Sequence, residues 1–105
     1  MSIPVDVAEL DRVLADFGTG YLLTVSATSA VKAVSVATAL VDGALVASGP
    51  GRGSVANAAA NPTVTLLFPP LVPGGHTLLV DGLASVVGED VRVEPSGAVL
   101  HQAAS

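Results

Sequence analysis

The strand-like segments of this chain follow one another too closely to form the parallel sheet of an α/β protein. Runs rich in β-branched and alternating apolar residues predict strands, with Asp42-Gly43 as a two-residue hairpin turn. These runs cover residues 21–27, 31–41, 44–48, 63–68, 76–88 and 91–94. Parallel neighbours need crossover connections of about a dozen residues, which are missing between most of these runs. We therefore expect a mainly β fold, in which six to seven antiparallel strands close into a small barrel.

Four other segments predict helices or a loop. Residues 4–17 carry apolar side chains at spacings of three and four and acidic residues early on, which predicts a helix that stops at Gly18. Ser54 is the predicted N-cap of a second, short helix, and residues 98–102 predict a brief terminal turn of helix. Residues 69–75, which are rich in proline and glycine, predict a loop.

The composition favours a small domain with a partner. A chain of 105 residues fits one domain, which we place at residues 1–105. Only 12% of the residues are charged, against roughly 25% in an average globular protein. This low fraction leaves little polar surface for an isolated small domain. We therefore expect part of the surface to be buried against a second subunit.

The charge balance and residue usage exclude several functions. Four basic residues face nine acidic ones, for a formal net charge of -5, so we expect neither nucleic-acid binding nor attraction to anionic membranes. The chain has no cysteine, which excludes disulfides, thiolate metal sites and cysteine nucleophiles. The acidic N-terminal residues do not fit a signal peptide, and no run of about 20 apolar residues could span a bilayer. We expect a cytoplasmic protein.

A glycine-rich segment lies between two predicted strands. Residues 49–54 read Gly-Pro-Gly-Arg-Gly-Ser and lead into the second predicted helix. Glycines let backbone N–H groups approach an anion, and the first turn of a helix leaves N–H groups without intrahelical partners. Arg52 is the positive side chain of this segment. The pattern therefore predicts a phosphate-binding loop.

Four segments of the chain resemble the pyridoxamine 5'-phosphate oxidase-like proteins, an FMN-binding split β-barrel family. They are residues 20–25, 41–46, 57–67 and 80–86. The third is the most specific, because Asn57 stands four residues before Asn61-Pro62 and a Val-x-Leu strand follows. Asp81-Gly82 taken alone predicts a hairpin turn, whereas the resemblance places it inside one long strand with a kink at the glycine.

This resemblance implies a split-barrel homodimer with FMN in grooves between the subunits and a small-molecule ligand beside it. It places the phosphate and the flavin ring against seven residues: Ser48, Arg52, Ser54, Lys32, Val34, Ser35 and Val36. The ring would rest on the strand over residues 34–38. Relatives that bind FMN well often have a lysine at the helix start, where this chain has Gly53-Ser54. The phosphate would therefore depend on Arg52, a serine hydroxyl, backbone N–H groups and Lys32.

Three function classes stay open. The first is an FMN-dependent oxidoreductase of unknown substrate, in which the cofactor supplies the chemistry and no strong catalytic side chain is needed. The second is a non-catalytic flavin or deazaflavin binder, and the third is a cofactor-free dimeric barrel that serves as a binding or structural module. We expect surface roles for His76 and His101, with no metal site, and a solvated turn at Glu89-Asp90.

Overall fold

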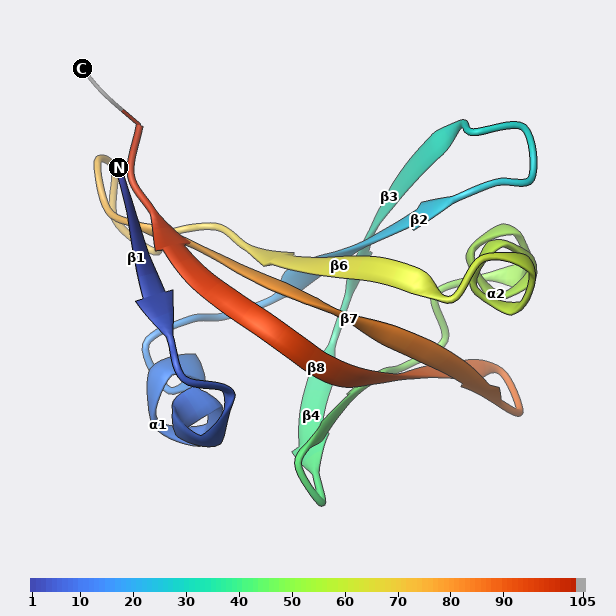
Figure 1. The fold of residues 1–105 in the computed structure, drawn as a ribbon, viewed down its shortest axis with the longest axis horizontal. Helices are drawn as coiled ribbons and strands as arrows, with labels where there is room; N and C mark the ends of the chain where they lie inside the picture. The colour runs from blue at the N-terminus through green and yellow to red at the C-terminus, as the bar shows by residue number, and fades with distance from the viewer. Residues whose placement is uncertain (104–105) are drawn as a thin grey trace.

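The chain folds into a strongly curled antiparallel sheet in a computed structural model, which describes residues 1–103 (Figure 1). Its strands are β1 (Ser2–Val5), β2 (Gly20–Val25), β3 (Val31–Val36), β4 (Thr38–Val41), β5 (Ala44–Ala47), β6 (Thr63–Phe68), β7 (Thr77–Val87) and β8 (Asp90–His101). Their order is β3-β2-β6-β7-β8-β5-β4, with β1 paired to β8. The predicted mainly β, antiparallel barrel class is confirmed. The sheet has eight strands instead of six to seven, because β1 is an addition at the edge of β8.

Small branched side chains fill the inner face of the curled sheet. Burial alternates along β2, β6 and the first half of β7, as expected for strands with one face on a core. The largest fully buried apolar side chains are Leu10, Leu22, Leu45, Leu66, Phe68, Leu78, Val80, Val91 and Val93. Full burial of a side chain of this size contributes about 1.5–3 kcal/mol. The residues between them face outward and stay outside this core.

The long strands β7 and β8 form the centre of the sheet. Asp81 and Gly82 lie inside β7, so the long-strand expectation is confirmed and the hairpin prediction is wrong there. The register between β7 and β8 shifts at this point, which marks a bulge. A Cβ at Gly82 would collide with the carbonyl oxygen of Glu94, so only glycine lets the two backbones approach this closely.

Both ends of the chain differ from their predicted structure. The helix predicted over residues 4–17 is instead strand β1, a 3₁₀ turn η1 (Val7–Glu9) and a short helix α1 (Leu10–Leu14). The helical turn predicted over residues 98–102 is the last part of β8. One pairing explains both errors, because Ser2–Val5 and Ala98–His101 form an antiparallel ladder. Backbone pairing between the two ends overrides the local helical periodicity.

The strand predicted over residues 31–41 is two strands that end at opposite edges of the sheet. β3 pairs with β2 and β4 pairs with β5, with Ala37 between them. The turn at Asp42-Gly43 is confirmed, and both residues have the positive φ that a tight hairpin turn requires. Among the described residues, no helix is long and apolar enough to cross a membrane.

Candidate functional site

The second helix, α2 (Arg52–Ala60), is attached to the sheet beside β2 and β7, at the opposite end of the molecule from α1 (Figure 1). The side-chain amide of Asn57 donates a hydrogen bond to Thr24 Oγ1 over 3.1 Å. Thr24 lies on β2 and is fully buried, so this bond holds the helix in one position on the sheet. The sequence singled out Asn57 by its place in a family-like segment, but it gave no signal for Thr24 as the partner.

The start of α2 differs from the predicted one. Gly51 occupies the N-cap position with φ 98° and ψ 162°, a conformation that essentially only glycine adopts. The helix therefore begins before Ser54, and the N-cap prediction for Ser54 is wrong. Ser54 is instead fully buried in the first turn, and its hydroxyl has no hydrogen-bond partner in the described part of the chain. No side chain caps this helix, so its first N–H groups remain available.

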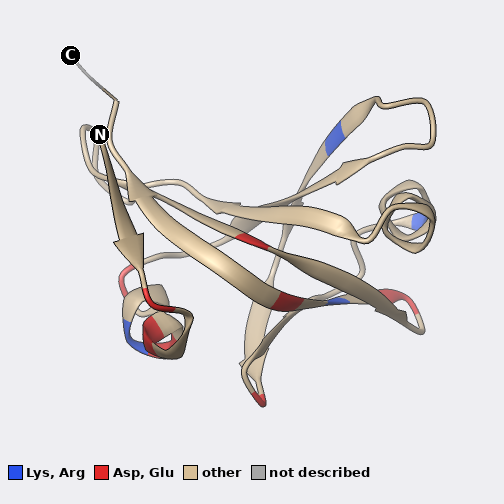
Figure 2. Cartoon of the chain, in the orientation of Figure 1, with Lys and Arg blue, Asp and Glu red and all other residues tan. Residues whose placement is uncertain are grey.

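Lys32 reaches the same helix start from strand β3. It pairs with Thr24 across the β2–β3 ladder, which places it beside the strand on which the helix lies. A Cβ built on Gly53 would lie 2.5 Å from Lys32 Nζ, so the ammonium group rests against the bare backbone of the first helical turn. Figure 2 shows the positive positions on β3 and α2 at the same end of the molecule. The structure therefore places Lys32 against the helix start that also carries Arg52.

Two positive side chains lie at this helix start without an ion-pair partner in the described residues. Within residues 1–103, the ion pairs join Arg12 to Glu9 and Arg92 to Glu94, and neither involves Lys32 or Arg52. The first turn of α2 has no acidic residue, and the helix dipole adds partial positive charge there. Two cations and free amides form a donor set that suits a phosphate group, whereas the hydroxyl of Ser54 is covered by the protein.

The turn between β7 and β8 brings acidic residues to the other side of the glycine loop. Asp90 Oδ1 accepts a hydrogen bond from the N–H of Gly49 over 2.9 Å, so its predicted role as a purely solvated residue is wrong. Glu89 lines a cavity of about 280 Å³ that also borders Arg52. One loop amide is therefore already bonded within the chain, and one carboxylate lies near the cationic helix start.

The remaining predicted site residues lie along β3 and at the end of β5. Ser48 is exposed, and its N–H donates to the carbonyl of Ala37 over 3.1 Å, which places the start of the loop beside the β3–β4 junction.

Val34 is half-buried and Val36 is buried, on the strand face that also carries Lys32. Ser35 is exposed on the opposite face. The predicted continuous strand over residues 34–38 is wrong, because the ladder breaks at Ala37.

Two larger cavities lie around α1, away from this site. One cavity of about 460 Å³ is lined by residues of α1, by the loop over residues 69–75 and by His76. His76 is half-buried, so it is not the plain surface residue that was predicted. The other, of about 340 Å³, lies between α1 and strands β4 and β5. His101 is exposed, with Nδ1 3.0 Å from Ser2 Oγ. No group of three potential metal-binding side chains occurs in the described chain.

Known structures share this arrangement over almost the whole chain. A FAD-binding protein from Mesorhizobium loti matches with a TM-score of 0.73 and 16% sequence identity, covering 99% of each chain. A candidate pyridoxamine 5'-phosphate oxidase from Listeria innocua matches with a TM-score of 0.72 and 20% identity, covering 92% of this chain and 98% of its own. The chain has the split β-barrel fold. The resemblance predicted from the sequence is therefore confirmed at the level of the fold.

Another solved structure of similar fold is named for a different cofactor. An F420 reductase matches this split barrel with a TM-score of 0.61 and 18% identity, covering 90% of this chain and 93% of its own. No family model matches the sequence, and the search of curated proteins found no match. Structural neighbours of this split barrel thus include proteins named for binding FAD and one named as an F420 reductase.

Proposed function

We propose that this split barrel binds a flavin nucleotide, with FMN as the simplest case, and acts as a flavin-dependent oxidoreductase on a small molecule. The proposed phosphate site is the start of α2, with Lys32, Arg52 and the first helical amides, including that of Ser54, as its donors. The observation that carries this proposal is the convergence of Lys32 Nζ on Gly53 beside Arg52. Two unpaired cations at an uncapped helix start favour a doubly charged anion over a neutral ligand.

The proposed roles of the other residues follow from their places on the sheet. Val34 lies on the same face of β3 as Lys32 and is half-buried, so a ring along this strand would meet its side chain beyond the phosphate, whereas Val36 is buried in the core and would offer only its backbone. Ser48 would contact the cofactor beside the β3–β4 junction. Ser35 would contact it from the opposite face of β3. A bound flavin supplies the hydride or electron transfer, while the protein positions the ring and limits access of water to it.

A homodimer is part of this proposal, and the outer face of the sheet supports it. Tyr21, Leu67, Leu79 and Val99 are in register across β2, β6, β7 and β8, and Tyr21 is 41% exposed. In the next row Asp81 accepts a hydrogen bond from the hydroxyl of Thr65 over 2.6 Å. An apolar row of this kind on a small protein with few charges is typical of a surface that pairs with a second subunit.

The dimer proposal is tested by placing a charge in this row. Tyr21→Glu should convert the dimer to a monomer, because the interface would have to bury an unpaired carboxylate. Val41→Glu is the control, since Val41 is similarly exposed at 49% but lies on β4, away from the row. Sedimentation velocity measures both. A wild-type protein that sediments as a monomer would rule the dimer out.

The flavin proposal is tested by titrating purified protein with FMN and following the quenching of flavin fluorescence. Saturable binding near one FMN per chain in the micromolar range is expected. Arg52→Ala should weaken it about tenfold or more, because a charge-assisted hydrogen bond contributes about 1.5–3 kcal/mol. Arg12→Ala is the matched control, since it removes the same charge from α1 and should leave the affinity unchanged. The absence of binding by wild type would reject the proposal.

A cofactor-free binding or structural module is the second candidate. It is favoured by the hydrogen bond from Gly49 to Asp90 and by Glu89 near Arg52, which both reduce the attraction for an anion. In that case the dimer would form without any flavin affinity, and Arg52→Ala would leave its behaviour unchanged. A protein that binds flavin but transfers no electrons to any acceptor would instead be a non-catalytic flavin or deazaflavin binder.

A further inference from the structure

The loop over residues 48–51, which joins β5 to α2, is held by two hydrogen bonds to distant parts of the chain. The N–H of Ser48 donates to the carbonyl of Ala37 over 3.1 Å, and the N–H of Gly49 donates to Asp90 Oδ1 over 2.9 Å. The first bond joins two backbone groups, so it does not depend on the side chains there. The second depends on one side chain, the half-buried carboxylate of Asp90 at the start of β8.

The backbone of this loop has much conformational freedom to lose, because two of its residues are glycines. Gly49 has φ 52° and Gly51 has φ 98°, and a residue without a Cβ can leave these conformations for many others. Pro50 lies between the two glycines, is buried, and has a ring that fixes its own φ. The carbonyl of Gly51 accepts the N–H of Val55 over 3.0 Å, which is the first bond of α2. The anchored Gly49 is therefore separated from the helix start by a single rigid residue.

Asp90 acts on an anion at α2 in two opposite directions. Its negative charge repels a phosphate at the helix start. Its hydrogen bond holds Gly49 in place, and a loop that is already ordered has less conformational entropy to lose when a ligand binds. The two effects are separable by substitution, because the side-chain amide oxygen of asparagine can accept the same hydrogen bond without a charge.

We propose that Asp90 is a positioning residue for the phosphate-binding loop, which it orders before a ligand binds. This inference rests on the proposed flavin site at the start of α2. The hydrogen bond from Asn57 to Thr24 holds the body of the helix on the sheet, whereas Asp90 fixes the loop that precedes its first turn. The gain from this order exceeds the repulsion between the carboxylate and the phosphate, so Asp90 raises the affinity in spite of its charge.

The test measures the FMN dissociation constants of wild type and three variants by flavin fluorescence. Asp90→Ala should raise the constant about fivefold or more, because the loss of a hydrogen bond to a charged group outweighs the loss of repulsion. Asp90→Asn should bind at least as tightly as wild type, since it keeps the acceptor oxygen and removes the charge. Glu89→Ala is the matched control, which removes an exposed carboxylate from the same turn and should not weaken binding.

Two further measurements separate the ordering of this loop from a general contribution to stability. Riboflavin carries the flavin ring without the phosphate, so its dissociation constant should be the same for wild type and Asp90→Ala. Amide hydrogen exchange of the ligand-free proteins should be faster in Asp90→Ala at Gly49, Gly51 and Arg52, and unchanged in the strands of the core.

The results distinguish a failure of this inference from a failure of the proposed function. An unchanged FMN constant or unchanged exchange in Asp90→Ala, or equal weakening in Asp90→Ala and Asp90→Asn, overturns the positioning role and leaves the flavin site in place. Tighter binding by all three variants also overturns it, because charge alone would then govern the affinity. Equal weakening of FMN and riboflavin by Asp90→Ala would assign the bond to stability instead. No FMN binding by wild type overturns both proposals.

Discussion

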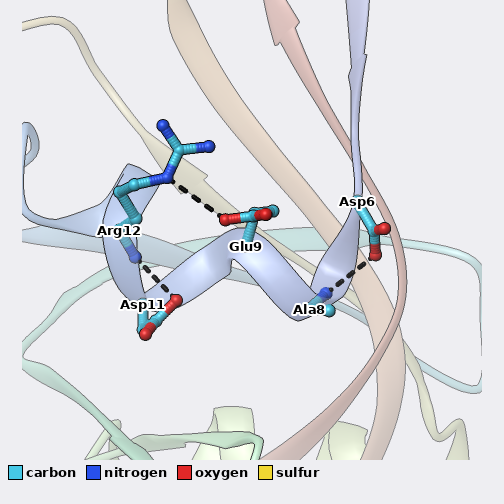
Figure 3. Close-up of polar contacts among 5 residues, drawn as sticks. All are labelled: Asp6, Ala8, Glu9, Asp11 and Arg12. Carbon is cyan, nitrogen blue, oxygen red and sulfur yellow. Dashed lines mark hydrogen bonds and ion pairs between the residues drawn. The ribbon is translucent and has the colours of Figure 1, made fainter.

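In the segment that leads into α1, carboxylates accept hydrogen bonds from neighbouring N–H groups and from Arg12, whereas the start of α2 leaves two cations without a carboxylate partner. Figure 3 shows Asp6 accepting the N–H of Ala8 over 3.0 Å and Asp11 accepting the N–H of Arg12 over 2.9 Å. Arg12 Nε also donates to Glu9 Oε2 over 3.1 Å. The start of α2 has a glycine in place of the aspartate cap and no acidic residue in its first turn.

The difference separates a helix start with acidic residues, which would repel an external anion, from one without acidic residues in its first turn, which is suited to bind an anion. The pair between Arg12 and Glu9 is well exposed, so it contributes at most about 1 kcal/mol to stability. Asp6 caps the 3₁₀ turn η1, which leads directly into α1, and α1 itself has no side-chain cap. At α2, the corresponding groups are the first helical amides, Lys32 and Arg52, and they lack such internal partners. An ion that binds α2 should therefore have no counterpart site at α1.

The largest effect is expected from removing both cations at α2. The double variant Lys32→Ala, Arg52→Ala should raise the FMN dissociation constant at least about 100-fold, since each charge-assisted hydrogen bond contributes about 1.5–3 kcal/mol. Flavin fluorescence titration measures this change. The matched control, Arg12→Ala with Arg92→Ala, removes the same number of positive side chains from other sites. Equal losses in the two double variants would show that overall charge, and not the α2 site, attracts the flavin.

A smaller effect is expected from the backbone at the start of α2. Gly51→Ala should lower the free energy of unfolding by about 1–3 kcal/mol, because φ 98° is strained for any residue with a Cβ. Urea denaturation measures this value. Gly97→Ala is the control, since a Cβ there meets no atom within 4 Å. If both variants were equally stable, the glycine cap would not be the reason that α2 begins at Arg52.

A loss of about 0.5–2 kcal/mol is expected when the cap of the 3₁₀ turn η1, which leads into α1, is removed. Asp6→Ala deletes the carboxylate that accepts the N–H of Ala8, which is the kind of cap that contributes about 1 kcal/mol. Thermal and urea denaturation should detect this loss. The FMN affinity should stay unchanged, and a weakened affinity would contradict the separation between the two helix starts.

The smallest effect is expected at Ser54, whose buried hydroxyl has no hydrogen-bond partner in the described residues. Without flavin, Ser54→Ala should leave stability unchanged or raise it by up to about 1 kcal/mol, because it removes a buried hydroxyl without a partner. The FMN affinity should stay unchanged, because the hydroxyl is fully buried and the backbone N–H at this position is retained. Ser96→Ala, whose hydroxyl donates to the carbonyl of Asp81, is a control that should lose stability.

The sequence predicted the parts of the fold that depend on local patterns. The strand at Thr63–Phe68 follows from its alternation and from Asn61-Pro62, and the turn at Asp42-Gly43 from its residue types. The two ends of the chain were mispredicted, because Ser2–Val5 pairs with residues nearly a whole chain length away. Pairing over such a separation leaves no local signal.

The same limit applies to the candidate site. The glycine segment and Arg52 were evident from their residue types, since glycine at a helix start has a recognisable pattern. The placement of Lys32 over Gly53 was not evident, because it depends on the register that pairs Lys32 with Thr24 and on the bond from Asn57 that positions α2. The N-cap prediction for Ser54 failed because Gly51 adopts a backbone conformation that brings the helix start forward.

The most direct test of the central claim is an amide NMR titration of the ¹⁵N-labelled protein with FMN. If the start of α2 binds the phosphate, the backbone amide signals of Arg52, Gly53 and Ser54 should shift saturably. The amides of Ala8 and Arg12, whose N–H groups are already bonded to carboxylates, should keep their positions. Unmoved signals at residues 52–54 at saturating FMN, or equal shifts at both helix starts, would contradict the claim.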